Sequence, residues 1–335
     1  MRNTTITDIA KKLKISASTV SRALNDYPDI NEETKNQVKM LAKKLNYWPN
    51  PIARSLKSNR TNVIGVIVPE IKHDFFSSAI SGIEEVAYHS GYTILVCQSN
   101  ESYDREVINT NALMHQRVAG FIVSISQSTT NGDHFKALLD RKIPLVFFDR
   151  AFDQLPAIKV VIDDAKSSCR AVTHLIERGY KKIAHFSGPI AMEISKQRLK
   201  GYKNALKKAN LPILNELIRY GGLQESDGYA SMDALIKENV IPDAIFAVND
   251  PVAIGAFQRI NEAGLKIPDD IAIVGFSNNK ITSLIEPPMT TVNQPSYEMG
   301  EKAAEILIEM IEKKKTHNEN KAIVFEAELV VRKST

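Results

Sequence analysis

The apolar positions at the start of the chain recur at the spacing of an α-helix. Two stripes have this spacing, and they consist of Ile9, Ala10 and Leu13, then Val20, Ala23 and Leu24. Lys14 and Ile15 fall between the stripes, while Thr7 and Ser16 are suitable N-cap residues for the two segments. The pattern therefore predicts two short helices joined by a tight turn.

The solvent side of the second predicted helix carries small or polar residues and one long basic side chain. These residues are Ala17, Ser18, Ser21 and Arg22. Such a face fits into the major groove of DNA, where it can meet the edges of base pairs. We therefore interpret residues 5–24 as a candidate DNA-reading motif.

A third helix is predicted from Asn31 to Leu45. Asn31 is a good N-cap residue, and the acidic residues that follow it suit the positive end of a helix. Its apolar stripe consists of Val38, Leu41, Ala42 and Leu45. This stripe can close a small three-helix core over the first two helices.

The segment after the third helix is interrupted by prolines. Asn50 followed by Pro51 favours the start of a new helix that extends only to about Lys57. A helix this short is marginal alone in water and needs DNA or its own copy in a dimer as a partner. The alternative is a plain linker, and residues 58–62 have the composition of one.

From Val63 onward, apolar runs of strand length alternate with helical patterns. Strands are predicted at 63–69, 92–98, 120–125, 144–149, 182–188, 218–220, 244–250 and 271–277. Helices are predicted at 76–88, 106–116, 167–177, 194–209, 226–238 and 252–263. Strands that are apolar throughout indicate parallel sheets covered on both faces. We expect an all-α head followed by two doubly wound α/β units.

Polar and aromatic residues gather just past the ends of these strands. They are Phe75, Phe76, Asp149, Arg150, Asn249, Asp250, Phe276 and Ser277, with Arg198 on a following helix. Ligands bind at the carboxyl ends of strands in such sheets, and a cleft between two units is a favoured place. Carboxylates, an amide and arginines among aromatic rings suit a sugar. Asp149–Arg150 and Asn249–Asp250 equally suit structural salt bridges or caps.

Composition and charge add a nucleic-acid partner to this picture. The chain has 335 residues, enough for two or three domains, and a net charge of +4. Residues 1–60 hold 12 Lys and Arg against 5 Asp and Glu, whereas the remainder is mildly acidic. A basic segment attached to an acidic body indicates that the head binds nucleic acid.

Several function classes lack their sequence signals. Cys97 and Cys169 form no CxxC pair, and the histidines show no metal-ligand spacing. GxGxxG, GxxxxGK[ST], HExxH and GxSxG are also absent. We predict no cofactor, no metal site and no catalytic residues. His73 and Asp74 near the expected pocket fit a ligand contact or a proton shuttle less well than a polar loop.

The start of the chain resembles no signal peptide, and no apolar run approaches the length of a membrane span. We therefore expect a cytoplasmic protein. This distinguishes the chain from secreted solute-binding proteins, which the body otherwise resembles. An enzyme with a fused DNA-binding head is a further alternative, and it would need catalytic groups in the cleft.

Longer segments resemble the LacI/GalR family of bacterial transcription regulators over nearly the whole chain. TITDIAKKLKISASTVSRALN is similar to that family's helix-turn-helix, and YWPNPIARSLK is similar to its hinge helix. GVIVPEIKHDFFSSAISGIEEVA, PLVFFDR, HLIERGYKKIAHFSG, RLKGYKNAL, FAVNDPVAIGA, IAIVGFSN and PPMTTVNQP follow its effector-binding core in order.

The resemblance implies residue roles and domain boundaries. DNA contacts or caps are implied at Thr5, Ser16, Ala17, Ser18, Thr19, Ser21, Arg22, Asn25, Tyr47, Asn50, Ala53, Leu56 and Lys57. Leu56 would enter the minor groove as a wedge. The strand-end residues named above would bind an effector. Implied domains are a head at 1–48, a hinge at 49–61, and two subdomains at 62–161 with 291–322 and 162–290 with 323–335.

The chain also departs from the family pattern. Ser277 stands where many members have a sugar-binding aspartate, and the only tryptophan, Trp48, is near the hinge. An indole therefore cannot stack on a sugar in the cleft. The chain ends at VVRKST without a heptad tail, so we expect a homodimer. The expected function is an effector-gated repressor that binds double-stranded operator DNA and a sugar or sugar phosphate.

Overall fold

The computed structural model describes residues 4–24, 26–45, 47, 61–313 and 321–335. The chain divides into two compact units, residues 1–61 and 62–335, which we call the head and the core. The predicted hinge helix, including Trp48, lies outside the described residues.

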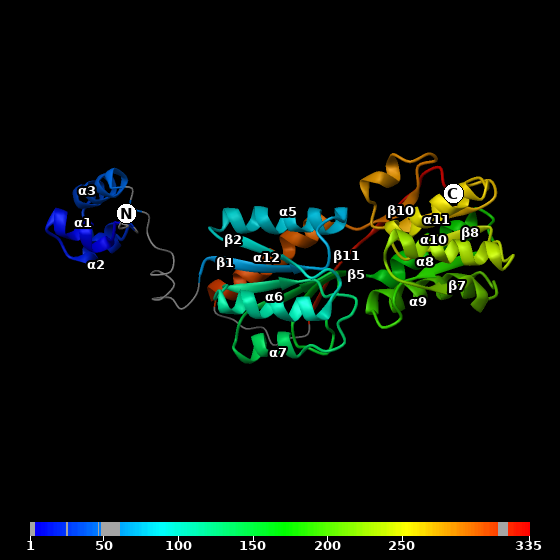
Figure 1. The fold of residues 1–335 in the computed structure, drawn as a ribbon, viewed down its shortest axis with the longest axis horizontal. Helices are drawn as coiled ribbons and strands as arrows, with labels where there is room; N and C mark the ends of the chain where they lie inside the picture. The colour runs from blue at the N-terminus through cyan, green and yellow to red at the C-terminus, as the bar shows by residue number, and fades with distance from the viewer. Residues whose placement is uncertain (1–3, 25, 46, 48–60, 314–320) are drawn as a thin grey trace. The chain divides into compact units, whose positions relative to one another are not determined.

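The head contains the three predicted helices, α1 (Ile6–Leu13), α2 (Ala17–Leu24) and α3 (Glu32–Lys44) (Figure 1). Their buried apolar side chains form one small core consisting of Ile9, Ala10, Val20, Ala23, Val38 and Ala42. Asn31 caps α3 as expected, because its Oδ1 accepts the Thr34 N–H at 2.8 Å. The cap of α1 is Thr5 rather than Thr7, since Asp8 reaches back to the Thr5 backbone N–H at 2.8 Å.

The first lobe of the core, lobe 1, is built on a six-stranded sheet in the order β11-β5-β4-β3-β1-β2. Its strands are β1 (Val63–Val68), β2 (Thr93–Gln98), β3 (Gly120–Val123), β4 (Leu145–Phe148), β5 (Ile158–Ile162) and β11 (Ala322–Phe325). Its helices are α5 (Asp74–His89), α6 (Tyr103–His115), α7 (Asp133–Asp140) and α12 (Ser296–Lys313). All the strand pairs are parallel, and helices cover both faces (Figure 1).

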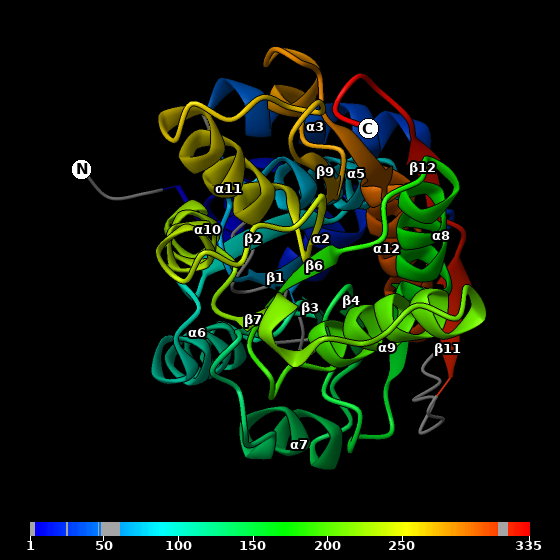
Figure 2. The same cartoon turned by 90° about the vertical axis from the view of Figure 1, so that its right-hand side faces the viewer.

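Lobe 2 repeats this plan, with the strand order β12-β10-β9-β8-β6-β7. Its strands are β6 (Ile183–Ser187), β7 (Ile218–Tyr220), β8 (Ala244–Ala247), β9 (Ala272–Phe276), β10 (Thr290–Asn293) and β12 (Glu328–Val330). Its α-helices are α8 (Asp164–Glu177), α9 (Glu193–Lys208), α10 (Glu225–Lys237) and α11 (Asp250–Glu262), with short 3-10 turns at Asn215–Leu217 and Lys280–Ser283. Figure 2 shows α8 and α9 on one side of β6, with α10 and α11 on the other. Only the β10–β12 pair is antiparallel among the described strands.

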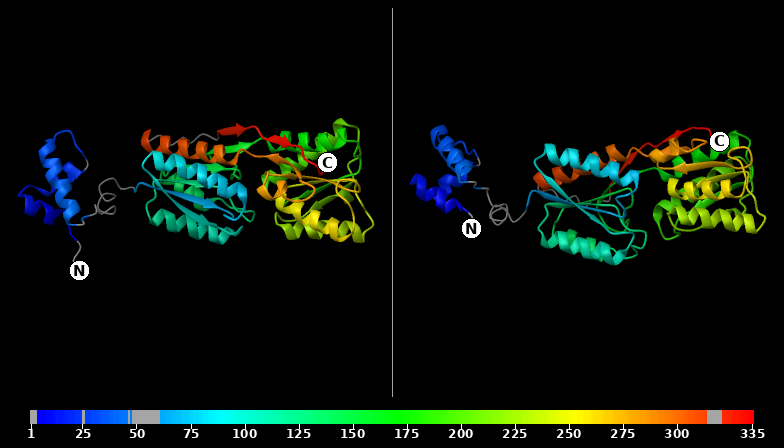
Figure 3. Two further views of the ribbon diagram at one scale, coloured as in Figure 1. Left: turned by 90° about the horizontal axis from the view of Figure 1, so that it is seen from above. Right: turned by 45° about the horizontal axis from the view of Figure 1, so that its top comes forward.

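The chain passes between the lobes at 162–164, 293–296 and 325–328, as Figure 3 shows. The implied subdomain boundaries differ slightly from these positions. They assigned 291–293 to the first subdomain, although β10 pairs with β9 in lobe 2. They also assigned 323–325 to the second, although β11 pairs with β5 in lobe 1. The predicted α/β class with two doubly wound units is confirmed.

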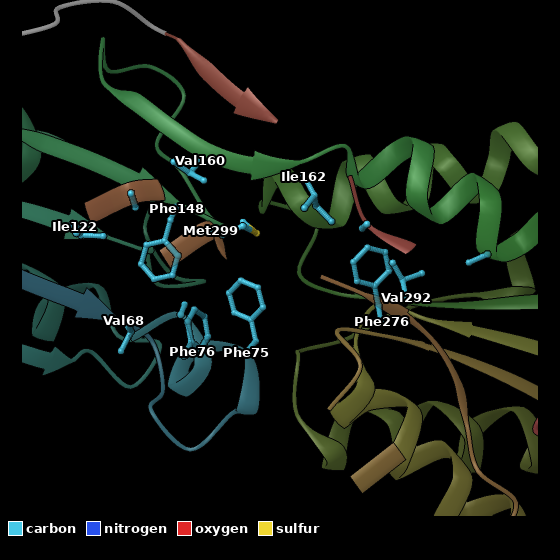
Figure 4. Close-up of a cluster of buried hydrophobic side chains, with 14 of the residues drawn as sticks. Val68, Phe75, Phe76, Ile122, Phe148, Val160, Ile162, Phe276, Val292 and Met299 are labelled. Carbon is cyan, nitrogen blue, oxygen red and sulfur yellow. The ribbon is translucent and has the colours of Figure 1, made fainter. Parts of the chain in front are cut away.

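One apolar cluster continues from lobe 1 into lobe 2. It includes Phe75, Phe76 and Phe148 on one side and Phe276 and Val292 on the other (Figure 4). The rings of Phe75 and Phe76 meet edge to face, with their centroids 5.2 Å apart. In the described ranges, no helix combines the length and apolar character needed to cross a membrane.

Candidate ligand cleft and nucleic-acid interface

The exposed face of α2 presents the side chains of Ser18 and Arg22, one helical turn apart. Ser16 begins this helix as predicted, because its Oγ accepts the Thr19 N–H at 3.0 Å. The same oxygen lies 2.6 Å from the Ser18 hydroxyl and 2.8 Å from the Thr19 hydroxyl. This end of α2 therefore offers hydroxyl and backbone donors of the kind that contact DNA phosphates.

Other predicted DNA-binding residues differ in their exposure. Ala17 and Tyr47 are partly buried and pack against the core of the head, so each has a structural role. Burial also raises the pKa of the Tyr47 phenol. Thr5 and Ser21 are half-buried. Asn25, Asn50, Ala53, Leu56 and Lys57 lie outside the described residues, and their contacts stay predictions.

A cavity of about 50 Å³ lies between the lobes, at the carboxyl ends of their strands. Seven of the predicted effector residues line it, namely Phe75, Phe76, Asp149, Arg150, Arg198, Asn249 and Ser277. Further lining residues were not predicted from the sequence, and they are Glu101, Ile194, Leu223, Gln224, Pro251, Asn279 and Gln294. His73, assigned to a polar loop, also lines the cavity. The strand-end rule therefore located the site but found only part of its wall.

In lobe 1, Arg150 is held by two carboxylates. Its Nη1 donates to both oxygens of Glu101, at 2.8 and 3.0 Å, and its Nε lies 3.6 Å from Asp149. The Asp149 side chain is only 8% exposed. Burial raises the pKa of Asp149 to about 6, although Arg150 and Arg198 act against this rise. Asp149 therefore titrates close to neutral pH.

In lobe 2, Arg198 is buried against Asp164, with 2.8 Å between Nε and Oδ1. Its Nη1 donates to the Val248 carbonyl at 2.5 Å, and the guanidinium lies 3.7 Å from the centroid of the Phe276 ring. Burial raises the pKa of Asp164 more than Arg198 lowers it. Arg198 is thus fixed by an anion, a carbonyl and a ring before any ligand arrives.

Two predicted effector residues do not line the cavity. Phe276 is fully buried and acts on the site only by supporting Arg198. Asp250 is also fully buried, where it accepts the Thr291 hydroxyl at 2.6 Å and the Asn279 N–H at 2.7 Å. Burial raises the pKa of Asp250 to about 6. Its carboxylate therefore orders the loop that carries Ser277, in place of the predicted contact with a ligand.

Backbone strain coincides with the cleft. Asp149 and Ser277 each follow a strand directly and have φ values of 57° and 119°. Residues other than glycine adopt such angles rarely, and strained conformations concentrate at functional sites. Ser277 also donates its hydroxyl to Gln294 at 3.0 Å.

Hydrogen bonds join the lobes at one mouth of the cleft. Gln224 donates its amide to Glu70 at 3.0 Å, and the Lys280 N–H donates to Asp74 at 2.7 Å. Burial would raise the pKa of Glu70, but the hydrogen bond from Gln224 and the neighbouring His73 lower it overall. These contacts hold the two lobes close together around the small cavity.

The fold and the cleft define a class of protein, a two-lobed ligand-binding core attached to a helix-turn-helix head. The family model for bacterial regulatory proteins of the lacI family matches residues 5–50. The model for a periplasmic binding protein-like domain matches residues 172–335.

Relatives match over nearly the full length. The HTH-type transcriptional repressor PurR of Vibrio atlanticus (strain LGP32) is 34% identical over 92% of each chain. Among solved structures, a complex of the transcriptional regulator CelR with cellobiose shares 28% identity and a TM-score of 0.75, covering 99% of this chain and 100% of CelR. The lac repressor dimer bound to operator and the anti-inducer ONPF has a TM-score of 0.87 at 24% identity, over 99% of each chain.

The chain therefore belongs to the lacI family of bacterial regulatory proteins. It is a DNA-binding transcriptional regulator and not an enzyme. The predicted family membership is confirmed.

Proposed function

We propose that the protein is an effector-gated repressor that binds a pseudo-palindromic operator as a homodimer. A small neutral molecule in the cleft between lobes 1 and 2 changes its affinity for DNA. One observation carries this proposal: buried, pre-positioned polar groups from both lobes face the same cavity, with Arg150 from lobe 1 and Arg198 from lobe 2. A ligand that touches both is sensitive to the angle between the lobes.

The charges in the cleft favour a neutral effector. Arg150 and Arg198 are cations, whereas Glu101, Asp149 and Asp164 are carboxylates. Each arginine already has a carboxylate partner, so neither offers an uncompensated charge to a phosphate group. We therefore propose a sugar as the effector in preference to a sugar phosphate.

A planar base, such as a purine, is the second candidate. Phe75 and Phe76 supply aromatic rings, while Gln294 brings an amide group to the same cavity. The Asn249 amide caps α11, because its Oδ1 accepts the Val252 N–H at 2.9 Å, and its Nδ2 donates to the Leu223 carbonyl at 2.9 Å. Rings with an amide at their edge suit a flat heterocycle as well as they suit a pyranose. The two candidates differ in shape and in hydroxyl content, and a ligand panel separates them.

The size of the cavity supports gating. About 50 Å³ has room for a few water molecules, whereas clefts that hold small molecules measure about 300–1,000 Å³. Open grooves of about 710 Å³ and about 550 Å³ adjoin the cavity and share His73 and Arg150 with it, respectively. Entry of a sugar would therefore require the lobes to separate. Breaking the Gln224–Glu70 and Lys280–Asp74 contacts would accompany this change.

A homodimer is supported by large apolar side chains that are exposed on the surface of the core unit, residues 62–335. They include Ile71, Tyr88 and Leu95 in lobe 1 and Ile281 and Leu284 in lobe 2, whose exposed fractions range from 40% to 72%. Soluble monomers rarely expose large contiguous apolar patches, and we propose that these side chains contribute to such a patch at a dimer interface. A twofold dimer would place two heads on the two half-sites of an operator.

Two measurements test the proposal. Selection of random DNA by the full chain should enrich a motif with two inverted half-sites. A thermal-shift screen against neutral sugars, their phosphates and purine bases should then identify a ligand that raises stability by mass action. That ligand should change the affinity for the selected DNA at least several-fold. A ligand that stabilises the protein but leaves DNA affinity unchanged would contradict the gating mechanism.

A further inference from the structure

The loop after α2 folds back over the end of that helix. The Tyr27 N–H donates to the Arg22 carbonyl at 3.1 Å, and the Ile30 N–H donates to the Tyr27 carbonyl at 3.3 Å. This fold brings Asp29 beside the side chain of Arg22, with 2.8 Å between Nη1 and Oδ2. The Tyr27 ring centroid also lies 5.8 Å from the guanidinium carbon.

A carboxylate at this position works against the attraction between the head and DNA. The head is basic, and a surface that meets phosphates gains affinity from each cation and loses it with each anion. The ion pair is half exposed, at 54% for Arg22 and 45% for Asp29. Pairs as exposed as this one stabilise a fold very little. Neither affinity nor stability therefore accounts for Asp29.

The position of Asp29 is explained if it orients the Arg22 side chain. A guanidinium carries more N–H donors than one carboxylate oxygen can use, so the paired side chain keeps donors for a base edge. An arginine recognises guanine by placing two donors on O6 and N7 at once, and this geometry is lost when the side chain rotates freely. A carboxylate on one side and a ring nearby restrict that rotation.

We propose that Asp29 determines base specificity by fixing the direction in which Arg22 presents its remaining donors. Asp29 is a positioning residue, since it acts through Arg22 rather than on a base. The inference rests on the proposed operator binding by the head. It predicts stronger discrimination between base pairs than the exposed face of α2 provides alone, because Ser18 is short and Arg22 is the only long basic side chain of α2.

The same loop supplies a matched control. Asp26 is also an exposed carboxylate, but it pairs with Lys39 at 2.5 Å and not with Arg22. Asp26→Asn and Asp29→Asn therefore remove the same charge from the same loop. Both variants should bind random DNA more tightly at low salt, by a similar factor. Only Asp29→Asn should lose selectivity.

The experiment is selection from a random DNA library by the full-length wild type, Asp26→Asn, Asp29→Asn and Arg22→Ala, followed by sequencing. Arg22→Ala identifies the base pair that Arg22 recognises. At that base pair, Asp29→Asn should reduce the preference by about two- to fivefold, the range that an exposed ion pair of up to about 1 kcal/mol can supply. Asp26→Asn should keep the wild-type preference. In the Arg22→Ala background, Asp29→Asn should have no further effect on the preference at that base pair.

Two results would overturn the inference. Asp29→Asn could retain the same preference as Asp26→Asn, which would make the ion pair irrelevant to recognition. It could instead bind the wild-type motif more tightly and more selectively, which would mean that Asp29 holds Arg22 away from DNA. Failure of the proposed function looks different, because the wild type itself would then enrich no motif. Circular dichroism and melting curves of each variant verify that the head remains folded.

Discussion

Replacing Arg198 with methionine removes a buried cation and keeps a side chain of similar length. In the wild type, Arg198 pairs with Asp164 and donates to the Val248 carbonyl, and its side chain is 3% exposed. The substitution leaves the Asp164 carboxylate buried without its partner. Removing one member of a buried ion pair destabilises a protein by about 3–5 kcal/mol.

The melting temperature should fall accordingly. A domain of about 150–250 residues loses about 2–4 °C per kcal/mol, so Arg198→Met should lower the melting temperature of the core by about 10 °C. The double variant Arg198→Met/Asp164→Asn removes both charges and should recover a large part of this loss. Urea unfolding of each variant, without any ligand, measures the free energies.

The pH dependence of the free energy of unfolding gives a second, independent test. Burial already raises the pKa of Asp164 in the wild type, and loss of Arg198 should raise it further. A carboxyl group whose pKa is higher in the folded than in the unfolded state favours folding at low pH. The loss of stability in Arg198→Met should therefore shrink as the pH falls, whereas that of the double variant, which lacks the Asp164 carboxyl group, should not shrink. A loss of unfolding free energy below about 1 kcal/mol in Arg198→Met, or a loss that does not depend on pH, would refute this reasoning.

Three further predictions concern the buried titratable groups and the DNA-reading helix. Asp149 has a pKa of about 6 in the fold against 3.8 in the unfolded chain, so Asp149→Asn should be more stable than the wild type by up to about 3 kcal/mol at pH 8. This gain should disappear near pH 4, and urea unfolding at both pH values measures it. Burial lowers the pKa of His185 to about 4. As the pH falls from about 6.5 to below 4, the free energy of unfolding of the wild type should therefore decrease by up to about 3 kcal/mol relative to that of His185→Phe. Equal dependence of the two free energies on pH would contradict this. Arg22→Ala should weaken binding to the selected operator by about 1–3 kcal/mol and broaden its sequence preference, as measured by titration with matched and altered DNA.

The cleft was predictable where a single sequence signal determined the position of a residue. Asp149 directly follows β4 and Asn249 lies two positions past the end of β8, and parallel strands all end at the same edge of a sheet. Asp250 follows the same signal, but adjacent side chains at the start of a helix point in different directions. Asn249 thus lines the cavity, whereas Asp250 turns into the core.

The remaining wall of the cavity depends on long-range packing. Glu101 reaches Arg150 from a loop 49 positions earlier, and no periodic pattern marks that loop. Gln294 follows β10, a strand of four residues whose threonines conceal its burial. The elements β5, β10, β11, β12, α7 and α12 were not predicted from the hydrophobic pattern. The same limitation explains the four strands, because short strands at or next to a sheet edge acquire their places from neighbours that are distant in sequence. It does not explain α12, whose buried Met299, Ala303 and Leu307 recur at helical spacing in the sequence.

The repeated passage of the chain between the lobes has a consequence for biosynthesis. Lobe 1 is not complete until α12 and β11 have left the ribosome, although its first strand begins at Val63. Lobe 2 requires β12 and the hydrogen bond from Ser334 to the Ile273 carbonyl. The small head has no such dependence and is free to fold early, because domains fold as units during synthesis. A nascent chain would therefore carry a folded DNA-binding head while both lobes are unfinished, and the ligand cleft would form only once α12, β11 and β12 are available.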